Sequence, residues 1–245
     1  MSEITIKSAF VTGGSKGIGY AIAEALLKRG IYVAISARNA GEVEAAVQKL
    51  SSLAHSSQSS AQVKGYAVNV LDAPGLHKAV NDAASSFGGL GLLVANAGAG
   101  IMASIVDMTL EQWNTVIETN LTGVFNSVKA ALPHLEASKG YLMTISSLAG
   151  KNAFAGGAAY NASKFGLNGM SEAMMLDLRP KGIKVSYIMP GSVATGFGGQ
   201  AVTEADDWKI DPADLAQLVI DLLEMSPRTL PSRVEVRPSQ TKSRG

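Results

Sequence analysis

Short apolar runs alternate with longer amphipathic segments along most of the chain. The apolar runs are rich in Val, Ile, Leu and Ala, as strands buried on both faces are. We predict strands over Ser8–Thr12, Tyr32–Ala37, Val63–Val70, Leu90–Ala95, Tyr141–Ser146, Lys184–Met189 and Arg233–Val236. The amphipathic segments repeat their apolar residues at the spacing of one helix face. They predict helices over Gly17–Arg29, Asn39–Leu50, Asp72–Phe87, Thr109–Leu135, Ala158–Leu178 and Pro212–Met225.

This alternation predicts an α/β fold of the Rossmann-like, doubly wound type. Strands that alternate with helices pair in parallel, because each connection crosses back over the sheet. We therefore expect a mostly parallel seven-stranded sheet with helices on both faces. No stretch has the composition of a linker, so residues 1–245 are predicted to form a single domain. Its halves span about 1–135 and 136–238, and a frayed tail follows at 239–245.

Composition and charge exclude several classes of protein. The chain has 245 residues, of which 47% are hydrophobic and 17% charged, and it contains no Cys. These values exclude extended disorder, a disulfide framework and thiolate metal sites. A net charge of +1 argues against binding to nucleic acid or to an anionic membrane. Without a leader pattern or a run of about 18 apolar residues, we expect a cytoplasmic protein with no membrane span. Its His residues are scattered along the sequence, so we predict no metal site.

A glycine-rich segment, TGGSKGIG at residues 12–19, connects the first predicted strand to the first predicted helix. In this position glycines let the backbone approach a pyrophosphate, and the helix N-terminus faces the anion. The segment predicts a dinucleotide site with contacts from Gly13, Ser15, Lys16, Gly17, Ile18 and Gly19. Residues 13–17 also fit the G-x-S-x-G pattern of hydrolase nucleophile elbows. That elbow needs earlier strands for its oxyanion loop, whereas only one predicted strand precedes Ser15.

Two cations lie where the adenosine ribose of a dinucleotide would bind. Arg38 stands 19 residues after Gly19, at the end of the second predicted strand, where an NAD site usually offers an acidic residue. Lys16 lies within the glycine-rich segment. A guanidinium and an ammonium at this place suit a 2′-phosphate, so they predict a preference for NADP(H) over NAD(H). The alternative is that both are solvated surface charges.

Tyr160 and Lys164 are four residues apart in a predicted helix, so they share one helix face. A nearby ammonium favours phenolate and would lower the pKa of Tyr160 from its usual value of about 10. Tyr160 can then pass a proton to a carbonyl oxygen. Ser147 lies 13 residues before Tyr160, and its hydroxyl can donate to the same oxygen. The neighbouring Ser146 is the alternative for this role, and the 13-residue spacing favours Ser147.

Other candidate residues follow the later strands. Open α/β sheets bind their ligands beyond the carboxyl ends of the strands, where these residues lie. The additional candidates for cofactor contact are Asn69, Val70, Asn96, Ala97, Gly98, Pro190, Gly191, Val193 and Thr195. One more polar candidate, Asn120, lies inside the helix predicted for Thr109–Leu135 instead of at a strand end.

With these motifs, TGxxxGxG and YxxxK above all, the chain resembles the short-chain dehydrogenase/reductase family from about residue 9 to residue 195. The resemblance implies that Tyr160 is the acid/base catalyst and that Ser147 orients the substrate. It further implies that Lys164 binds the nicotinamide ribose, that Asn120 holds a water in a proton relay, and that Thr195 contacts the nicotinamide carboxamide. The first half of the chain would then bind the cofactor, and the second half would carry the catalytic and substrate-binding residues.

The resemblance also implies an activity and an assembly. We expect NADPH-dependent reduction of a ketone or aldehyde to an alcohol by hydride transfer, with 3-oxoacyl thioesters as one candidate substrate class. We expect a homodimer or homotetramer. Two alternatives remain open, namely an NAD(P)-dependent alcohol dehydrogenase of the same fold and a dinucleotide-binding sensor or scaffold without turnover. Four loop residues either line an apolar substrate pocket or merely pack the loops: Met102, Phe154, Phe197 and Trp208.

Overall fold

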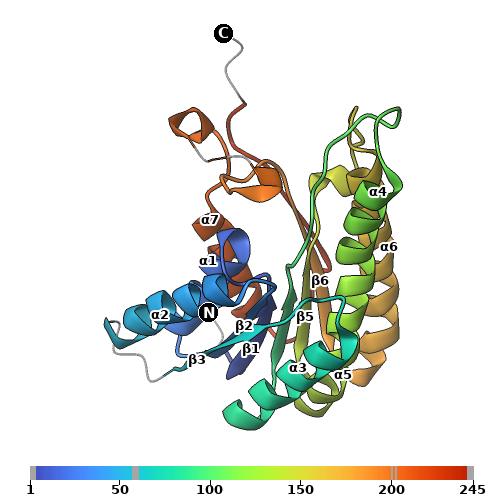
Figure 1. Cartoon of the computed structure of the whole chain (residues 1–245). Helices are drawn as coiled ribbons and strands as arrows, with labels where there is room; N and C mark the ends of the chain where they lie inside the picture. The colour runs from blue at the N-terminus through green and yellow to red at the C-terminus, as the bar shows by residue number, and fades with distance from the viewer. Residues whose placement is uncertain (1–3, 57–60, 200, 202, 242–245) are drawn as a thin grey trace.

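A computed structural model describes residues 4–56, 61–199, 201 and 203–241, and it shows one parallel sheet between two layers of helices (Figure 1). The strands are β1 (Ser8–Thr12), β2 (Tyr32–Ala37), β3 (Val63–Ala67), β4 (Leu92–Ala95), β5 (Tyr141–Ile145), β6 (Lys184–Pro190) and β7 (Arg233–Val236). Their order is β3-β2-β1-β4-β5-β6-β7, and every neighbouring pair is parallel. The predicted fold class, a doubly wound seven-stranded α/β sheet, is therefore confirmed.

Helices cover both faces of the sheet (Figure 1). Helices α1 (Gly17–Lys28), α2 (Ala40–Ser56) and α7 (Pro212–Leu223) cover one face, and α3 (Ala73–Phe87), α5 (Gly123–Ser138) and α6 (Ala158–Leu178) cover the other. Successive β1 residues alternate between the two layers, because side chains point to opposite faces of a strand. Ala9 and Val11 join the cluster under α1, whereas Phe10 joins the cluster under α3 and α5.

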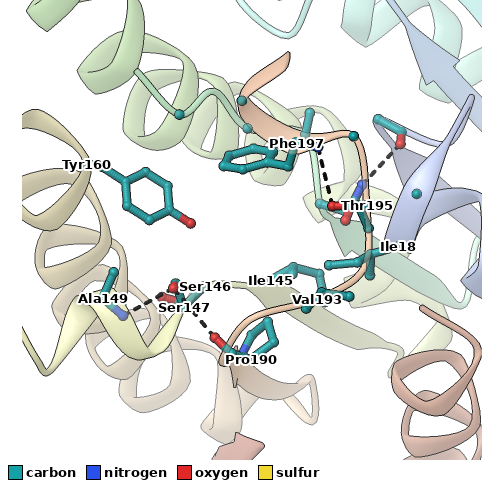
Figure 2. A pocket seen from close by; sticks show the side chains of 18 of the residues that line it. Ile18, Ile145, Ser146, Ser147, Ala149, Tyr160, Pro190, Val193, Thr195 and Phe197 are labelled. Carbon is teal, nitrogen blue, oxygen red and sulfur yellow. Dashed lines mark hydrogen bonds between the residues drawn. The ribbon is translucent and has the colours of Figure 1, made fainter. Parts of the chain in front are cut away.

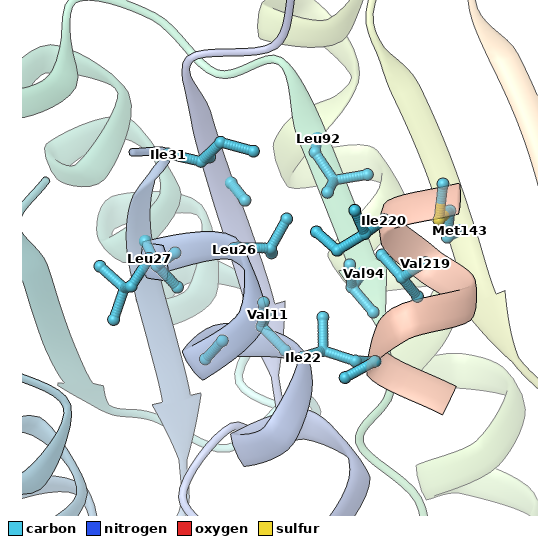
Figure 3. Packing of buried hydrophobic residues seen from close by; sticks show 14 of the residues in the cluster. Val11, Ile22, Leu26, Leu27, Ile31, Leu92, Val94, Met143, Val219 and Ile220 are labelled. Atoms are coloured by element: carbon cyan, nitrogen blue, oxygen red, sulfur yellow. The ribbon is translucent and has the colours of Figure 1, made fainter. Parts of the chain in front are cut away.

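The core on the α1 face explains why these segments read as continuous apolar runs. Leu26 and Ile22 of α1 are fully buried against Val11 and Val94 of the central strands (Figure 3). From the other side of this core, α7 contributes Val219. Strands that are covered on both faces have no solvent side, so they need no polar residue at alternate positions.

Several element boundaries differ from the prediction, and at the end of β3 local polar contacts explain the difference. Strand β3 ends at Ala67, three residues before the predicted Val70. The side chain of Asn69 accepts a hydrogen bond from the Leu71 backbone N–H at 3.1 Å, and the Asn69 carbonyl accepts from the Asp72 N–H at 2.9 Å. Such an Asn turn diverts the backbone from the strand ladder. Helix α2 continues to Ser56, beyond the predicted end at Leu50.

The helix predicted over Thr109–Leu135 is interrupted. It consists of α4 (Leu110–Ile117), a π-helical turn at Glu118–Thr122, and α5. A π turn accommodates one extra residue, and such turns are frequent at functional sites. Gly123, just after this turn, lies so close to Val70 that a Cβ would overlap the valine side chain. The interruption therefore occurs where the helix passes the loop after β3.

The sheet order creates a crevice between β1 and β4. From β1 the chain proceeds to β2 and β3 on one side, and from β4 it proceeds to β5, β6 and β7 on the other. The loops that leave β1 and β4 therefore diverge, and ligands bind at such a switch point. No helix among the described residues is long and apolar enough to cross a membrane. Residues 242–245 of the tail predicted to fray lie outside the described residues.

Replacing Leu26 by Ala tests the packing of α1 on the sheet. We expect a loss of about 2–5 kcal/mol in the free energy of unfolding, because the deletion leaves a cavity in a filled core. Leu110→Ala is the matched control, since that leucine is 74% exposed and its truncation should cost little. Urea denaturation of both variants measures the difference. Equal stability of the two variants would contradict the packing described.

Candidate active site

The loop after β1 and the loop after β4 are tied together at the switch point. The Thr12 hydroxyl accepts hydrogen bonds from the backbone N–H groups of Asn96 and Ala97, each at 3.0 Å. In return, the Asn96 side chain donates to the carbonyl oxygens of Thr12 at 2.9 Å and Gly13 at 3.1 Å. Four hydrogen bonds thus fix the glycine-rich loop against the neighbouring strand end.

Two of the loop glycines are required by geometry. Gly13 has φ = +65°, a conformation that L-residues with a side chain rarely adopt. Gly19, in the first turn of α1, lies so close to Gly13 and Asn96 that a Cβ would overlap the Gly13 carbonyl oxygen. The helix N-terminus can therefore approach the loop closely, as anion binding at a helix start requires.

A cavity of about 1660 Å³ opens beyond the carboxyl ends of the strands. This volume exceeds the roughly 300–1,000 Å³ of a pocket for one drug-sized ligand, so it has room for a dinucleotide with a second molecule beside it. Every residue that we predicted for the site lines the cavity, apart from Gly19 and Asn120. Figure 2 shows Tyr160 and Ser147 on one side of the pocket and Thr195 across from them.

Two buried polar atoms in this cavity have no partner. Ser36 Oγ, near the end of β2, and Trp208 Nε1 form no hydrogen bond with any described residue, and both side chains line the cavity. Buried polar groups are almost always hydrogen-bonded in folded proteins. Unpartnered atoms of this kind fit a cavity that holds a polar ligand. Together with the glycine loop and the volume, they fit a bound dinucleotide.

The two predicted cations differ in their surroundings. Lys16 Nζ forms an ion pair with Glu42 Oε1 at 3.1 Å, and Ser15 Oγ donates to Glu42 Oε2 at 3.3 Å. Arg38 is exposed and also lines the cavity. Sequence reasoning did not identify Glu42 as a residue of the site, although the sequence contains one signal for its position. Asn39 and Glu42 have the spacing of a helix-capping pair, which would have placed Glu42 in the first turn of α2.

Ser146 and Ser147 have different environments. Ser146 Oγ donates to Asn168 Oδ1 at 2.5 Å, and its side chain is buried. Ser147 Oγ accepts from the Ala149 N–H at 3.1 Å and lies 3.5 Å from the Pro190 carbonyl, at the limit of a hydrogen bond. Ser147 lines the same cavity as Tyr160. This arrangement favours Ser147 as the hydroxyl that donates to the substrate oxygen, because the Ser146 hydroxyl already donates its hydrogen to Asn168.

Lys164 is buried below Tyr160 in the first turns of α6. Its side chain is 5% exposed, and Nζ donates to the Ile145 carbonyl at 3.0 Å. Nζ lies 5.8 Å from the centre of the Tyr160 ring. Burial lowers the pKa of Lys164 to about 8, because removing water disfavours the ammonium. The side chain still carries its charge at neutral pH and has hydrogen atoms left to donate.

The predicted lowering of the Tyr160 pKa is wrong for this structure. Burial raises the pKa of Tyr160 above its ordinary value of 10, and the nearby Ser147 hydroxyl offsets only part of that rise. The phenolate loses more from desolvation than it gains from its polar neighbours. Tyr160 is therefore a neutral phenol at neutral pH, with a proton to donate.

Asn120 lies in the π turn and is almost fully buried. Its Oδ1 accepts from the Ala99 N–H at 2.7 Å, and its Nδ2 donates to the Ala99 carbonyl and to Ser163 Oγ, both at 2.9 Å. Both amide hydrogens are used, so the side chain joins the loop after β4 to α6. A water in the predicted relay would need a backbone carbonyl of this turn instead of the Asn120 amide.

The four loop residues with two alternative roles all line the cavity. Phe197 packs against Tyr160 with ring centres 5.8 Å apart, and Figure 2 shows it across the pocket from the Ser147 side. Its ring lies against Gly100, where a Cβ would leave no room. Met102 is 51% exposed, Phe154 47% and Phe197 45%, so these side chains offer apolar surface to a ligand instead of burying it in loop packing.

The part of the chain that the structure describes holds no group of three or more His, Asp or Glu side chains placed to bind a metal ion.

Comparisons with known proteins place this site in a family. A family model described as short chain dehydrogenase matches residues 7–206. The chain belongs to the short-chain dehydrogenase family. An uncharacterised oxidoreductase of Staphylococcus aureus is 31% identical over 239 residues, which cover 97% of this chain and 100% of that protein.

Solved structures agree with this family. An alcohol dehydrogenase from the archaeon Thermococcus sibiricus, in complex with 5-hydroxy-NADP, has a TM-score of 0.89 at 25% identity, with 98% of this chain and 100% of that one covered. A metagenomic short-chain oxidoreductase in complex with NADP has a TM-score of 0.81 at 30% identity, with the same shares covered, 98% and 100%. The chain is an oxidoreductase of this family, and its fold binds a nicotinamide dinucleotide.

The buried ammonium of Lys164 should make stability depend on pH. The pKa of Lys164 is about 8 in the folded protein, whereas the ordinary pKa of a lysine, expected for the unfolded chain, is 10.5. Between these values the unfolded chain binds more protons, so the stability of the wild type should rise with pH relative to Lys164→Met. Urea denaturation at several pH values measures this difference. Lys49→Met, which replaces an exposed lysine of α2, is the control for loss of one lysine charge. A difference between wild type and Lys164→Met that stays flat from about pH 8 to 10 would contradict the burial.

Proposed function

We propose that the protein reduces a ketone or aldehyde to an alcohol with NADPH, and that Tyr160 is the proton donor. One observation carries the proposal. A neutral, partly buried phenol, a serine hydroxyl and a buried ammonium line the same cavity as the glycine loop. Reduction of a carbonyl needs a proton for the developing alkoxide, and a protonated phenol supplies it.

The residues divide the work between binding and chemistry. When bound, the dinucleotide supplies the hydride. The glycine loop and the N-terminus of α1 bind its phosphates. The hydroxyls of Ser147 and Tyr160 hold the carbonyl oxygen of the substrate, and Tyr160 gives it a proton. Lys164 binds the nicotinamide ribose with its remaining hydrogens, and its charge favours the phenolate that is left behind.

The apolar cavity wall supports an apolar carbonyl substrate. Met102, Phe154 and Phe197 line the same cavity as Tyr160 and offer it exposed apolar surface. A 3-oxoacyl thioester is one such substrate, because its apolar acyl chain can pack against this surface. The reverse reaction, oxidation of an alcohol, uses the same residues and needs Tyr160 as phenolate. With its pKa raised, Tyr160 holds at neutral pH the proton that reduction requires.

Arg38 and Lys16 support a preference for NADPH. Both line the cavity beyond β2, and the end of that strand, Ala37, offers no carboxylate to a ribose hydroxyl. The alcohol dehydrogenase and the metagenomic oxidoreductase that this chain resembles were solved with NADP compounds. A sensor without turnover has no use for Ser147, Tyr160 and Lys164 together.

The cofactor preference is testable by binding alone. NADPH should bind at least about tenfold more tightly than NADH, because a guanidinium pairs with the 2′-phosphate. Arg38→Asp should reverse the order of the two dissociation constants. Arg179→Asp, an exposed arginine outside the cavity, is the control and should leave the order unchanged. Titrations followed by nicotinamide fluorescence measure both constants for each protein. Equal affinities of the wild type for the two dinucleotides would contradict the preference.

The proton donor is tested by removing one oxygen. Tyr160→Phe should lower the rate of carbonyl reduction by about 10²-fold or more, because general acid catalysis is lost, while NADPH binding is kept. Lys164→Met should weaken both binding and turnover. Tyr32→Phe is the matched control for loss of a phenol oxygen. Tyr32 is the first residue of β2, at the end of the strand that lies away from the cavity. A Tyr160→Phe enzyme with nearly wild-type turnover would exclude Tyr160 as donor.

A further inference from the structure

A carboxylate occupies the place where the 2′-phosphate is expected. Glu42 contacts both Lys16 and Ser15, two residues of the glycine-rich loop, and it lines the same cavity. Arg38 lines the same cavity and has no ion pair with any of the described residues. In the expected phosphate subsite, Arg38 therefore has no counter-ion among the described residues, whereas Lys16 is already paired with Glu42.

The position of Glu42 follows from the start of α2. The Asn39 side chain accepts a hydrogen bond from the Glu42 backbone N–H at 3.0 Å, so it caps the helix. Because Asn39 directly follows Arg38 at the end of β2, the cap fixes the first turn of α2 beside the glycine-rich loop. Glu42 thus reaches Lys16 from an anchored backbone.

We propose that Glu42 sets the cofactor selectivity of this enzyme by competing with the 2′-phosphate for Lys16. This inference rests on the proposed function, in which Lys16 and Arg38 bind that phosphate. A phosphate that pairs with Lys16 must displace the Glu42 carboxylate from the ammonium, and breaking that ion pair costs binding free energy. NADH has a 2′-hydroxyl in the same place, which can donate a hydrogen bond to a carboxylate. Glu42 therefore weakens the binding of NADPH and does not weaken the binding of NADH.

The exposure of the pair limits the size of the effect. The Lys16 and Glu42 side chains are 76% and 44% exposed, so water screens their attraction. Exposed ion pairs change equilibrium constants by up to about fivefold. Glu42 should thus narrow the preference for NADPH without reversing it.

The first experiment compares two glutamates of the same helix. Dissociation constants for NADPH and NADH are measured by fluorescence titration for the wild type, Glu42→Gln and Glu44→Gln. Glu42→Gln should raise the ratio of the NADH constant to the NADPH constant by about threefold to fivefold. Glu44→Gln removes the same charge from an exposed residue outside the cavity, so it controls for the net charge of the protein. An unchanged ratio in Glu42→Gln, or an equal rise in Glu44→Gln, would overturn the proposal.

The second experiment tests whether Glu42 acts through Lys16. The same titrations are made in Lys16→Met and in Lys16→Met/Glu42→Gln. The effect of removing the carboxylate should shrink when Lys16 is absent, because nothing is left to compete for. An effect of the same size in both backgrounds would overturn the proposal. A wild type that binds neither dinucleotide would instead disprove the proposed function, so the two failures are distinguishable.

Discussion

The site depends on the hydrogen bonds that join the loops after β1 and β4. Thr12 and Asn96 come from strands that are adjacent in the sheet but far apart in the sequence, and each bonds to the backbone of the other loop. They hold the glycine loop at the point where the two halves of the sheet diverge. Every further element of the site is placed relative to this point. The residues proposed for the 2′-phosphate follow β1 and β2, and the catalytic residues follow β5 and begin α6.

Burial determines the chemistry on the catalytic side. Tyr160 is partly buried and Lys164 is buried, so the pKa of the phenol is raised and that of the ammonium is lowered. At neutral pH the phenol therefore keeps its proton, and the ammonium remains charged beneath it. This pairing is consistent with an enzyme that delivers a proton to an oxygen as negative charge develops there.

The sequence predicted the fold well, because strands covered on both faces must be apolar at every position. The predicted site residues, apart from Gly19 and Asn120, line one cavity, since the carboxyl ends of parallel strands meet at one edge. The break after Ile117 was missed, because one extra residue in a helix hardly changes the apolar periodicity. The ion pair of Lys16 with Glu42 was missed because it joins two loops whose separation only the folded sheet fixes. The raised pKa of Tyr160 was missed because burial cannot be read from the spacing of Tyr and Lys.

The most direct test follows the hydride itself. NADPH carrying deuterium at the transferable position of its nicotinamide is incubated with the wild-type enzyme and a panel of apolar ketones and aldehydes. The alcohols formed are then analysed by mass spectrometry. The account predicts at least one alcohol with deuterium on the former carbonyl carbon. If the enzyme binds NADPH and yet no member of a broad panel yields labelled alcohol, the central claim of carbonyl reduction is contradicted, and a dinucleotide sensor becomes the better description.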